Sequence, residues 1–184
     1  MTKNDLDVII NGCRRGDRLS QKRLYQQFYT YGVNISHRYA RTNVEAEEIL
    51  NDAFLRIFTK IEMYNIDLPF VTWFHTIVVR SAINYLKKYE NKPVTMDIEM
   101  GRAAIIQEDA LSKMSSDEII ALVRQLPPSY RATFNLSVVE GYAHSEIAAI
   151  MGVTEGTARS NLMIARQKLQ KMVSQSKKIV EYGR

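Results

Sequence analysis

The sequence is poor in the features that would place it outside ordinary globular proteins. It has one cysteine, Cys13, so no disulfide can form within the chain, and we expect a protein of the reducing cytoplasm. Its 8 glycines and 4 prolines among 184 residues are too few for a collagen-like or a disordered chain. Its longest apolar runs are only a handful of residues, so we expect no insertion into a membrane. The first residues, MTKND, lead into an amphipathic segment without a signal-peptide core.

The residue patterns of common enzyme and metal sites are also missing. The three histidines, His37, His75 and His144, lie far apart in the sequence and share no familiar metal-binding spacing with cysteine or carboxylates. The chain has no glycine-rich phosphate loop and no nucleophile elbow. We therefore expect no catalytic residue, no metal and no cofactor, and an enzyme is the least favoured class of function.

Positive charge, by contrast, is concentrated at one end of the chain. The whole sequence has 25 lysines and arginines against 20 aspartates and glutamates, a net charge of +5. Residues 154–184 contain 7 basic and 2 acidic residues, a net charge of +5. Residues 1–153 contain 18 basic and 18 acidic residues, so all the net charge of the chain lies in residues 154–184. This excess indicates an end that binds nucleic acid, with a solvated basic tail as the alternative.

Apolar residues recur with a helical period over almost the whole chain, and no segment alternates with the period of two expected of a strand. The clearest stripe runs from Ile49 to Ile61 along one side of a helix. Residues 90–116 keep no such period and predict a linker. We therefore predict an all-α fold with two small helical domains joined by a flexible linker. The helices are expected at residues 5–14, 17–41 with Asp17 as cap, 46–59, 70–88, 117–126, 128–140, 144–151 and 154–174.

Residues 144–170, HSEIAAIMGVTEGTARSNLMIARQKLQ, carry the strongest functional signal. A short helix, a Met-Gly-Val turn and a longer helix capped by Thr154 have the pattern of a helix-turn-helix. The spacing turns Ala158, Leu162, Ala165 and Leu169 inward. The other side of the second helix then presents Thr157, Arg159, Ser160, Met163, Arg166 and Gln167. Such residues reach base edges and phosphates in a major groove, whereas a hairpin that only builds a core is the alternative.

Short motifs in both halves of the chain follow one another in a characteristic order. In the C-terminal half they are LPPSYR (126–131), EGY (140–142) and GTARS (156–160). In the N-terminal half they are GD (16–17), LY (24–25), AEE (46–48), NDAFLR (51–56), FVTWF (70–74) and AINYL (82–86). At these spacings the chain resembles bacterial RNA polymerase sigma factors of the sigma-70 family, most closely those of the extracytoplasmic-function (ECF) group.

The resemblance implies a transcription initiation factor that binds core RNA polymerase and directs it to promoters. Residues 1–90 would form the region 2 domain, residues 91–116 the linker, and residues 117–184 the region 4 domain, a four-helix unit. The helix of residues 46–59 would dock on the clamp of the largest subunit, β′, and other core subunits would also be contacted. The residues implied in core binding are Glu48, Asn51, Asp52, Leu55 and Arg56.

The resemblance also implies two sites for promoter DNA. The helix after Pro69 and the loop before it would open the −10 element and hold it as single-stranded DNA, through Tyr64, Asn65, Arg80, Asn84, Lys87 and Lys88. Within this set, Tyr64 and Asn65 would handle an unstacked base, whereas we expect Trp73 to pack in the core. The helix-turn-helix, from Ala143 to Leu162 and onward, would read the −35 element as duplex, through Arg131, Thr157, Arg159, Ser160, Met163 and Arg166.

Some positions depart from the family pattern. Asn161 and Ile164 differ from the usual recognition helix, so the −35 preference cannot be transferred from a relative. Ala143 replaces a capping serine, a loss of about 1 kcal/mol if nothing compensates. An anti-sigma factor, often membrane-associated in this family, is a further partner that the resemblance implies. The alternative is a helix-turn-helix regulator that acts without polymerase, and co-purification with polymerase would discriminate between the two.

Overall fold

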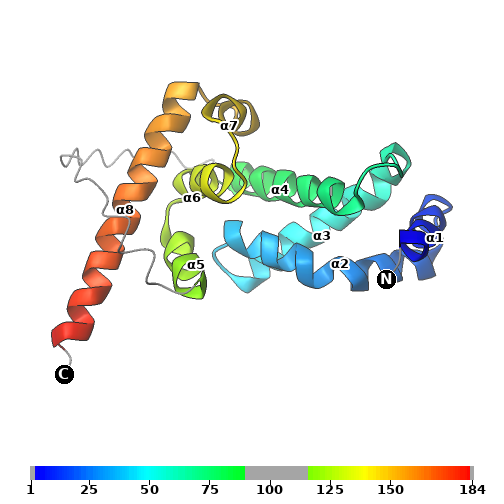
Figure 1. Ribbon diagram of the computed structural model, residues 1–184, viewed down its shortest axis with the longest axis horizontal. Helices are drawn as coiled ribbons and strands as arrows, with labels where there is room; N and C mark the ends of the chain where they lie inside the picture. The colour runs from blue at the N-terminus through cyan, green and yellow to red at the C-terminus, as the bar shows by residue number, and fades with distance from the viewer. Residues whose placement is uncertain (1–2, 90–115, 183–184) are drawn as a thin grey trace. The chain divides into compact units, whose positions relative to one another are not determined.

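The computed structural model describes residues 3–89 and 116–182, and every regular element within these two stretches is helical (Figure 1). The all-α fold predicted from the sequence is therefore confirmed. The elements are α1 (Lys3–Arg14), α2 (Arg18–Tyr39), α3 (Asn43–Lys60), the 3-10 turn η1 (Ile61–Met63), α4 (Phe70–Tyr89), α5 (Ser116–Gln125), α6 (Pro128–Phe134), the π-helical turn η3 (Asn135–Val139), α7 (His144–Met151) and α8 (Glu155–Tyr182). The chain divides into two compact units, Met1–Tyr85 and Leu86–Arg184. The expected linker lies outside the described residues, apart from Ser116 at the start of α5.

Phe74 of α4 lies at the centre of the first unit's core. Its side chain is fully buried, and its ring centroid lies 5.0 Å from that of Phe28 on α2 and 5.5 Å from that of Phe54 on α3. These contacts join three helices, which lie side by side in Figure 1. Gly32 permits this close packing, because a Cβ there would lie 2.5 Å from Leu50 Cδ1 and 3.0 Å from Phe74 Cζ. The core side of α3 is the apolar stripe that the sequence predicted.

Polar side chains mark the beginnings of α2 and α3. Asp17, the expected cap, accepts hydrogen bonds from the backbone N–H groups of Leu19 and Ser20 at 3.3 and 2.9 Å. Thr42 accepts one from the N–H of Glu45 at 3.1 Å. Each bond satisfies a donor in the first turn that has no partner within the helix. These caps fix where both helices begin, and α3 begins at Asn43, before the start at residue 46 expected from the sequence.

The second unit is built around α8, against which α5, α6 and α7 pack. Its core consists of Leu122, Val123, Leu126, Phe134, Leu162, Ala165, Leu169 and Val173. The inward orientation predicted for Ala158, Leu162, Ala165 and Leu169 is confirmed, because all four are buried. Ala148 on α7 and Ala158 on α8 are both small, which lets these two helices approach closely.

The helix expected over residues 128–140 is regular only in its first half. From Asn135 it continues as a π-helical turn, in which the N–H of Glu140 donates to the carbonyl of Asn135 at 3.0 Å. Gly141, with a φ of 77°, follows directly and ends the helix. Val138 and Val139 remain exposed on this turn.

The last helix is longer than the sequence analysis predicted. We expected it to end near Ser174, whereas α8 continues to Tyr182. No glycine or proline stands between Ser174 and Gly183, so this stretch contains no strong signal to stop a helix. As a result, α8 spans 28 residues and extends beyond the core of the second unit.

Candidate functional site

The outer side of α3 carries the residues that the resemblance assigns to polymerase binding. They are Glu48, Asn51, Asp52, Leu55 and Arg56, and all five are exposed. Their spacing of three and four residues places them on one side of the helix. The opposite side of α3 is buried in the core of the first unit. The fold therefore brings these five residues together on one accessible surface.

Two tyrosines from neighbouring helices hold side chains of this surface in place. The hydroxyl of Tyr25 on α2 donates to Asn51 Oδ1 at 3.4 Å, and that of Tyr85 on α4 donates to Glu48 Oε2 at 3.2 Å. Burial raises the pKa of Tyr25, so its hydroxyl remains a donor at neutral pH. Side chains ordered in this way lose less conformational entropy when a partner binds.

Two apolar side chains complete this surface. Val44 and Leu55 are 75% and 67% exposed, although both are aliphatic. They lie about three helical turns apart and therefore on the same side of α3. The sequence analysis named Leu55 but missed Val44, whose signal was an apolar residue outside the buried stripe. We call Val44 and the five residues above the docking surface.

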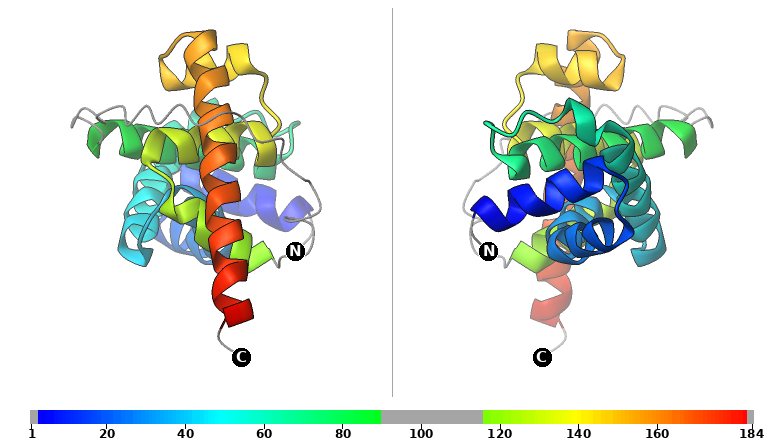
Figure 2. Two further views of the ribbon diagram at one scale, coloured as in Figure 1. Left: turned by 90° about the vertical axis from the view of Figure 1, so that its left-hand side faces the viewer. Right: turned by 90° about the vertical axis from the view of Figure 1, so that its right-hand side faces the viewer.

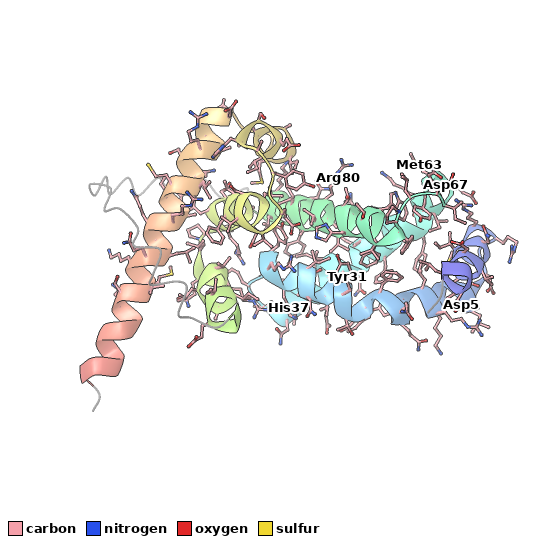
Figure 3. The ribbon with its side chains drawn as sticks, viewed as in Figure 1. Asp5, Tyr31, His37, Met63, Asp67 and Arg80 are labelled. Atoms are coloured by element: carbon pink, nitrogen blue, oxygen red, sulfur yellow. The ribbon has the colours of Figure 1, made fainter. Side chains whose placement is uncertain are left out.

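The C-terminal half of α4 exposes the residues assigned to the −10 element. Arg80, Asn84, Lys87 and Lys88 are exposed and follow one another mostly at intervals of three or four residues, so they form a stripe. Arg80 projects from α4 on the side away from α2 (Figure 3). We call these four residues the α4 stripe. It carries three positive charges and no negative one.

Tyr64 does not present its ring to a base, contrary to the expectation. Its side chain is only 4% exposed, and its ring centroid lies 5.2 Å from those of both Phe70 and Trp73. Its hydroxyl donates to the carbonyl of Leu68, and burial raises its pKa, so the hydroxyl stays protonated. The reason is the large apolar area of the ring, which is buried when it packs against α4. Trp73 is half-buried against the same rings, as expected for a packing role.

The rest of this loop nevertheless exposes side chains suited to an unstacked base. Asn65 is exposed, and its Oδ1 accepts the N–H of Asp67 at 3.0 Å, a bond that leaves its NH2 donors unused. Met63 and Leu68 flank it and are 77% and 60% exposed. Met63 and Asp67 lie together at one end of the first unit (Figure 3). Residues 63–68 are called the base loop below. The sequence analysis missed Met63 and Leu68 in this loop, although their apolar character in a loop was a signal that could have identified them.

The expected helix-turn-helix is formed by α7 and α8. Gly152 ends α7 with a φ of 72°, and Thr154 caps α8 by accepting the N–H of Thr157 at 3.1 Å. At the start of α7, Glu146 Oε2 accepts the N–H of Ala143 at 2.8 Å. Ala143 has no side-chain acceptor to offer in return. Half of a capping box is therefore present at this helix.

The outer side of α8 carries the residues expected at the −35 element. Thr157, Arg159, Ser160, Met163 and Arg166 are all exposed, and we call them the recognition face. Arg159 Nη2 donates to Glu155 Oε1 at 2.8 Å, one helical turn away. An exposed ion pair of this kind contributes about 0.3–0.5 kcal/mol, so a nucleic-acid partner can replace it at little cost.

Arg131 does not belong to this face, although we expected it to contact phosphate as Arg166 would. Its side chain is fully buried. It lies in α6, where Ala132 and Phe134 are buried as well, and α6 packs along α8. Arginine side chains are usually exposed, and the burial of Arg131 depends on packing that the motif does not encode. The expected phosphate contact of Arg131 is therefore wrong for this structure.

Three further features of the described residues concern metal ions, membranes and the cysteine. Within residues 3–89 and 116–182, no group of three or more His, Cys, Asp and Glu side chains could hold a metal ion. None of the described helices is both long enough and apolar enough to cross a membrane. Cys13 is buried, and this burial raises the pKa of its thiol to about 11. The thiolate, the reactive form, is therefore scarce at neutral pH.

Comparison with known proteins finds relatives for both halves of the chain. Residues 24–92 match the model of sigma-70 region 2, and residues 116–169 match that of sigma-70 region 4. The chain is 25% identical over 178 residues to the ECF RNA polymerase sigma-E factor of Escherichia coli K12, which covers 90% of this chain and 93% of that protein. It is 25% identical over 183 residues to the RNA polymerase sigma-H factor of Pseudomonas aeruginosa, covering 93% and 95%. A solved structure of the sigma factor RpoE from Bartonella quintana, in complex with the anti-sigma factor NepR, has a TM-score of 0.49 and 17% identity, covering 83% of this chain and 96% of that chain.

The two matched regions together cover about two thirds of the chain. A regulator that acts without polymerase would need only a DNA-binding region such as region 4, so the match to region 2 disfavours that alternative. The chain belongs to the sigma-70 family of RNA polymerase sigma factors, in its ECF group, and is a transcription initiation factor that binds core polymerase and directs it to promoters.

Proposed function

We propose that the three surfaces described above divide the work of promoter recognition. The docking surface binds core polymerase, the base loop and the α4 stripe hold the −10 element as a single strand, and the recognition face reads the −35 element. The observation that carries this division is that each surface gathers exposed side chains of the appropriate chemistry on one helix side or one loop.

Polymerase binding is assigned to α3 because its exposed side combines the features of a protein interface. Val44 and Leu55 supply apolar area that is otherwise left in water, and Asp52 and Arg56 supply charge at its edge. We place the clamp of the β′ subunit on this surface, by family resemblance, and other core subunits elsewhere.

Single-strand binding is assigned to the base loop together with the α4 stripe. The amide of Asn65 can donate to the edge of a base, and the exposed side chains of Met63 and Leu68 can cover its face. Arg80, Lys87 and Lys88 then offer positive charge to the phosphates that follow. Tyr64 is excluded from direct contact and supports the loop from within.

Duplex reading is assigned to α8, with Arg159 in its second turn placed to donate two parallel hydrogen bonds to a guanine. Glu155 holds the guanidinium until DNA replaces it. Arg166 lies about two turns further on and contacts phosphate. Ser160 and Met163, between them, contact neighbouring base pairs.

We further propose the domain division 1–90, 91–116 and 117–184, which is supported by the end of one family match at residue 92 and the start of the next at residue 116. The chain works in the cytoplasm, where polymerase acts, and it binds rather than catalyses. An anti-sigma factor is a further partner, by family resemblance.

Reconstitution with core polymerase tests this function. The purified chain is mixed with core enzyme, and run-off transcription is measured over the promoters of the source genome. We expect a stable complex on gel filtration and transcripts that begin at a subset of promoters sharing two short elements. Binding to duplex DNA as a dimer, with no complex with core enzyme, would contradict the proposal.

A further inference from the structure

Arg14, the last residue of α1, reaches across to the chain that enters the base loop. Its Nη2 donates to the carbonyl oxygen of Tyr64 at 2.6 Å, and its Nε donates to that of Ile61 at 3.5 Å. Its Nη1 donates to Asn11 Oδ1 at 3.4 Å, which steadies the guanidinium from its own helix. Figure 2 shows α1 running alongside this loop, in agreement with the contacts between α1 and η1.

The carbonyl that Arg14 bonds, that of Tyr64, belongs to the peptide unit that sets the orientation of Asn65. The carbonyl of Tyr64 and the N–H of Asn65 belong to the same planar peptide unit, so a donor that fixes one also fixes the other. The loop beyond is closed by its own bonds, from the N–H of Leu68 to the carbonyl of Asn65 at 3.1 Å and from the N–H of Asp67 to Asn65 Oδ1 at 3.0 Å. These two bonds tie Asn65 to Asp67 and Leu68, and Arg14 holds the chain at the entrance of the loop.

The position of α1 is itself fixed by a tight corner with α2. A Cβ on Gly12 would lie 2.0 Å from Ser20 Oγ, so the two helices meet at a distance that only glycine allows. The hydroxyl of Ser20 donates to Asp17 Oδ2, and Asp17 caps α2. Gly16, with a φ of 73°, makes the turn between the helices. The tight turn between α1 and α2 therefore also places Arg14 within hydrogen-bonding distance of the base loop.

We propose that Arg14 is a positioning residue for base reading in the −10 element. From α1, which lies outside the segment matched to region 2, it holds the base loop in the shape that receives an unstacked base. This inference rests on the role proposed above for the loop. It makes α1 part of the single-strand site without any contact between α1 and DNA.

Two substitutions at Arg14 and one at its neighbour form the test. Arg14→Met keeps a long side chain but removes the donors, and Arg14→Lys keeps the charge but offers one nitrogen in place of the fork. Arg15→Met removes the same charge from an adjacent, exposed residue and is the matched control. Each variant is assembled with core polymerase, and binding is measured to single-stranded −10 oligonucleotides in which every base is substituted in turn.

We expect Arg14→Met to reduce the preference for one base roughly 10-fold, because a reading group displaced by about an ångström loses much of its discrimination. Arg14→Lys should fall between Arg14→Met and the unmodified chain, and Arg15→Met should match the unmodified chain. Affinity for core enzyme and for a −35 duplex should stay the same in all of them. If Arg14→Met instead lowers the affinity for every oligonucleotide and for core enzyme alike, Arg14 only stabilises the fold, and the inference is overturned.

Asn65→Ala distinguishes a failure of the role proposed for Arg14 from a failure of the role proposed for the base loop. It should abolish the preference at the same base, and adding Arg14→Met to it should then change that preference no further. If Asn65→Ala alters the preference but Arg14→Met behaves like Arg15→Met, the role of Arg14 is wrong while that of the loop stands. If Asn65→Ala changes no base preference, the role proposed for the loop is the one that fails.

Discussion

Arg159 is held by a neighbour on its own helix before any DNA is bound. Its bond to Glu155 orders the guanidinium over the first turns of α8, where base edges meet an inserted helix. The pair is exposed and therefore weak, so it orders the side chain without competing strongly with guanine. Arg166 has no acidic residue one turn before it, because Leu162 occupies that position. The two arginines are therefore expected to differ in their contribution.

We predict different consequences for these two arginines. Arg159→Ala should cost about 1–3 kcal/mol of promoter binding and relax the preference at one base pair, because a bidentate contact is lost. Arg166→Ala should lower the affinity for all DNA sequences by a similar factor and should reduce the dependence of that affinity on salt concentration, because a phosphate contact is lost. Holoenzyme binding to a panel of −35 duplexes at several salt concentrations measures both effects. Unchanged sequence preference in Arg159→Ala would show that the recognition face is misplaced.

At the scale of elements, α7 and α8 begin with different caps. Thr154 supplies a side-chain oxygen at the start of α8, whereas Ala143 supplies none at the start of α7. Glu146 compensates only in part, because it covers the N–H of Ala143 and leaves its own N–H without a side-chain acceptor at the cap. The short first helix of the motif is therefore held by packing more than by capping.

This difference predicts a stabilising substitution. Ala143→Ser should raise the free energy of unfolding by up to about 1 kcal/mol, because its hydroxyl can accept the N–H of Glu146 and complete the box. Thr154→Ala, as the opposite control, should lower it by about the same amount. Urea unfolding followed by circular dichroism measures both. A loss of stability in Ala143→Ser would mean that the present backbone at this cap does not accept a serine.

The outer side of α3 allows a second test at this scale. Asp52→Lys should weaken binding to core enzyme by about 2 kcal/mol or more if its carboxylate is paired and desolvated in the complex. The fold should survive, because Asp52 is exposed and its buried neighbours are untouched. Asp5→Lys makes the same charge change on α1 and should bind normally. Fluorescence titration with core polymerase measures the affinity of each variant. Equal affinities for Asp52→Lys and Asp5→Lys would show that core polymerase docks on another surface.

At the scale of the whole molecule, two compact units each carry a complete core. Phe74 and its ring partners unite the helices of the first, and the cluster around α8 unites those of the second. Each core is assembled from residues of its own unit.

We therefore predict that residues 1–90 and residues 116–184 fold when they are produced separately. Each fragment should show cooperative thermal unfolding and dispersed amide signals in NMR spectra, because each buries its own core. The first should bind core polymerase but not a −35 duplex. A fragment that stays unfolded would show that the two units depend on each other for stability.

The sequence by itself determined the features that depend on local pattern. Helical spacing placed Leu162 and Leu169 inside and Arg159 outside, and Asp17 and Thr154 were recognisable as caps, because these effects act over one or two turns. The order of the motifs likewise identified the family, since motif spacing is read directly from the chain. The two regions and their expected roles followed from that.

Only the tertiary structure decided which of the remaining polar and aromatic residues reach the surface. Tyr64 is buried against α4 and Arg131 lies in a buried stretch of α6, whereas Val44, Met63 and Leu68 are left in water. Arg14 bonds a carbonyl 50 residues away, a contact that no periodic pattern encodes. The physical reason is that burial and long-range hydrogen bonding depend on which surfaces of different helices meet, and residues distant in sequence decide that together.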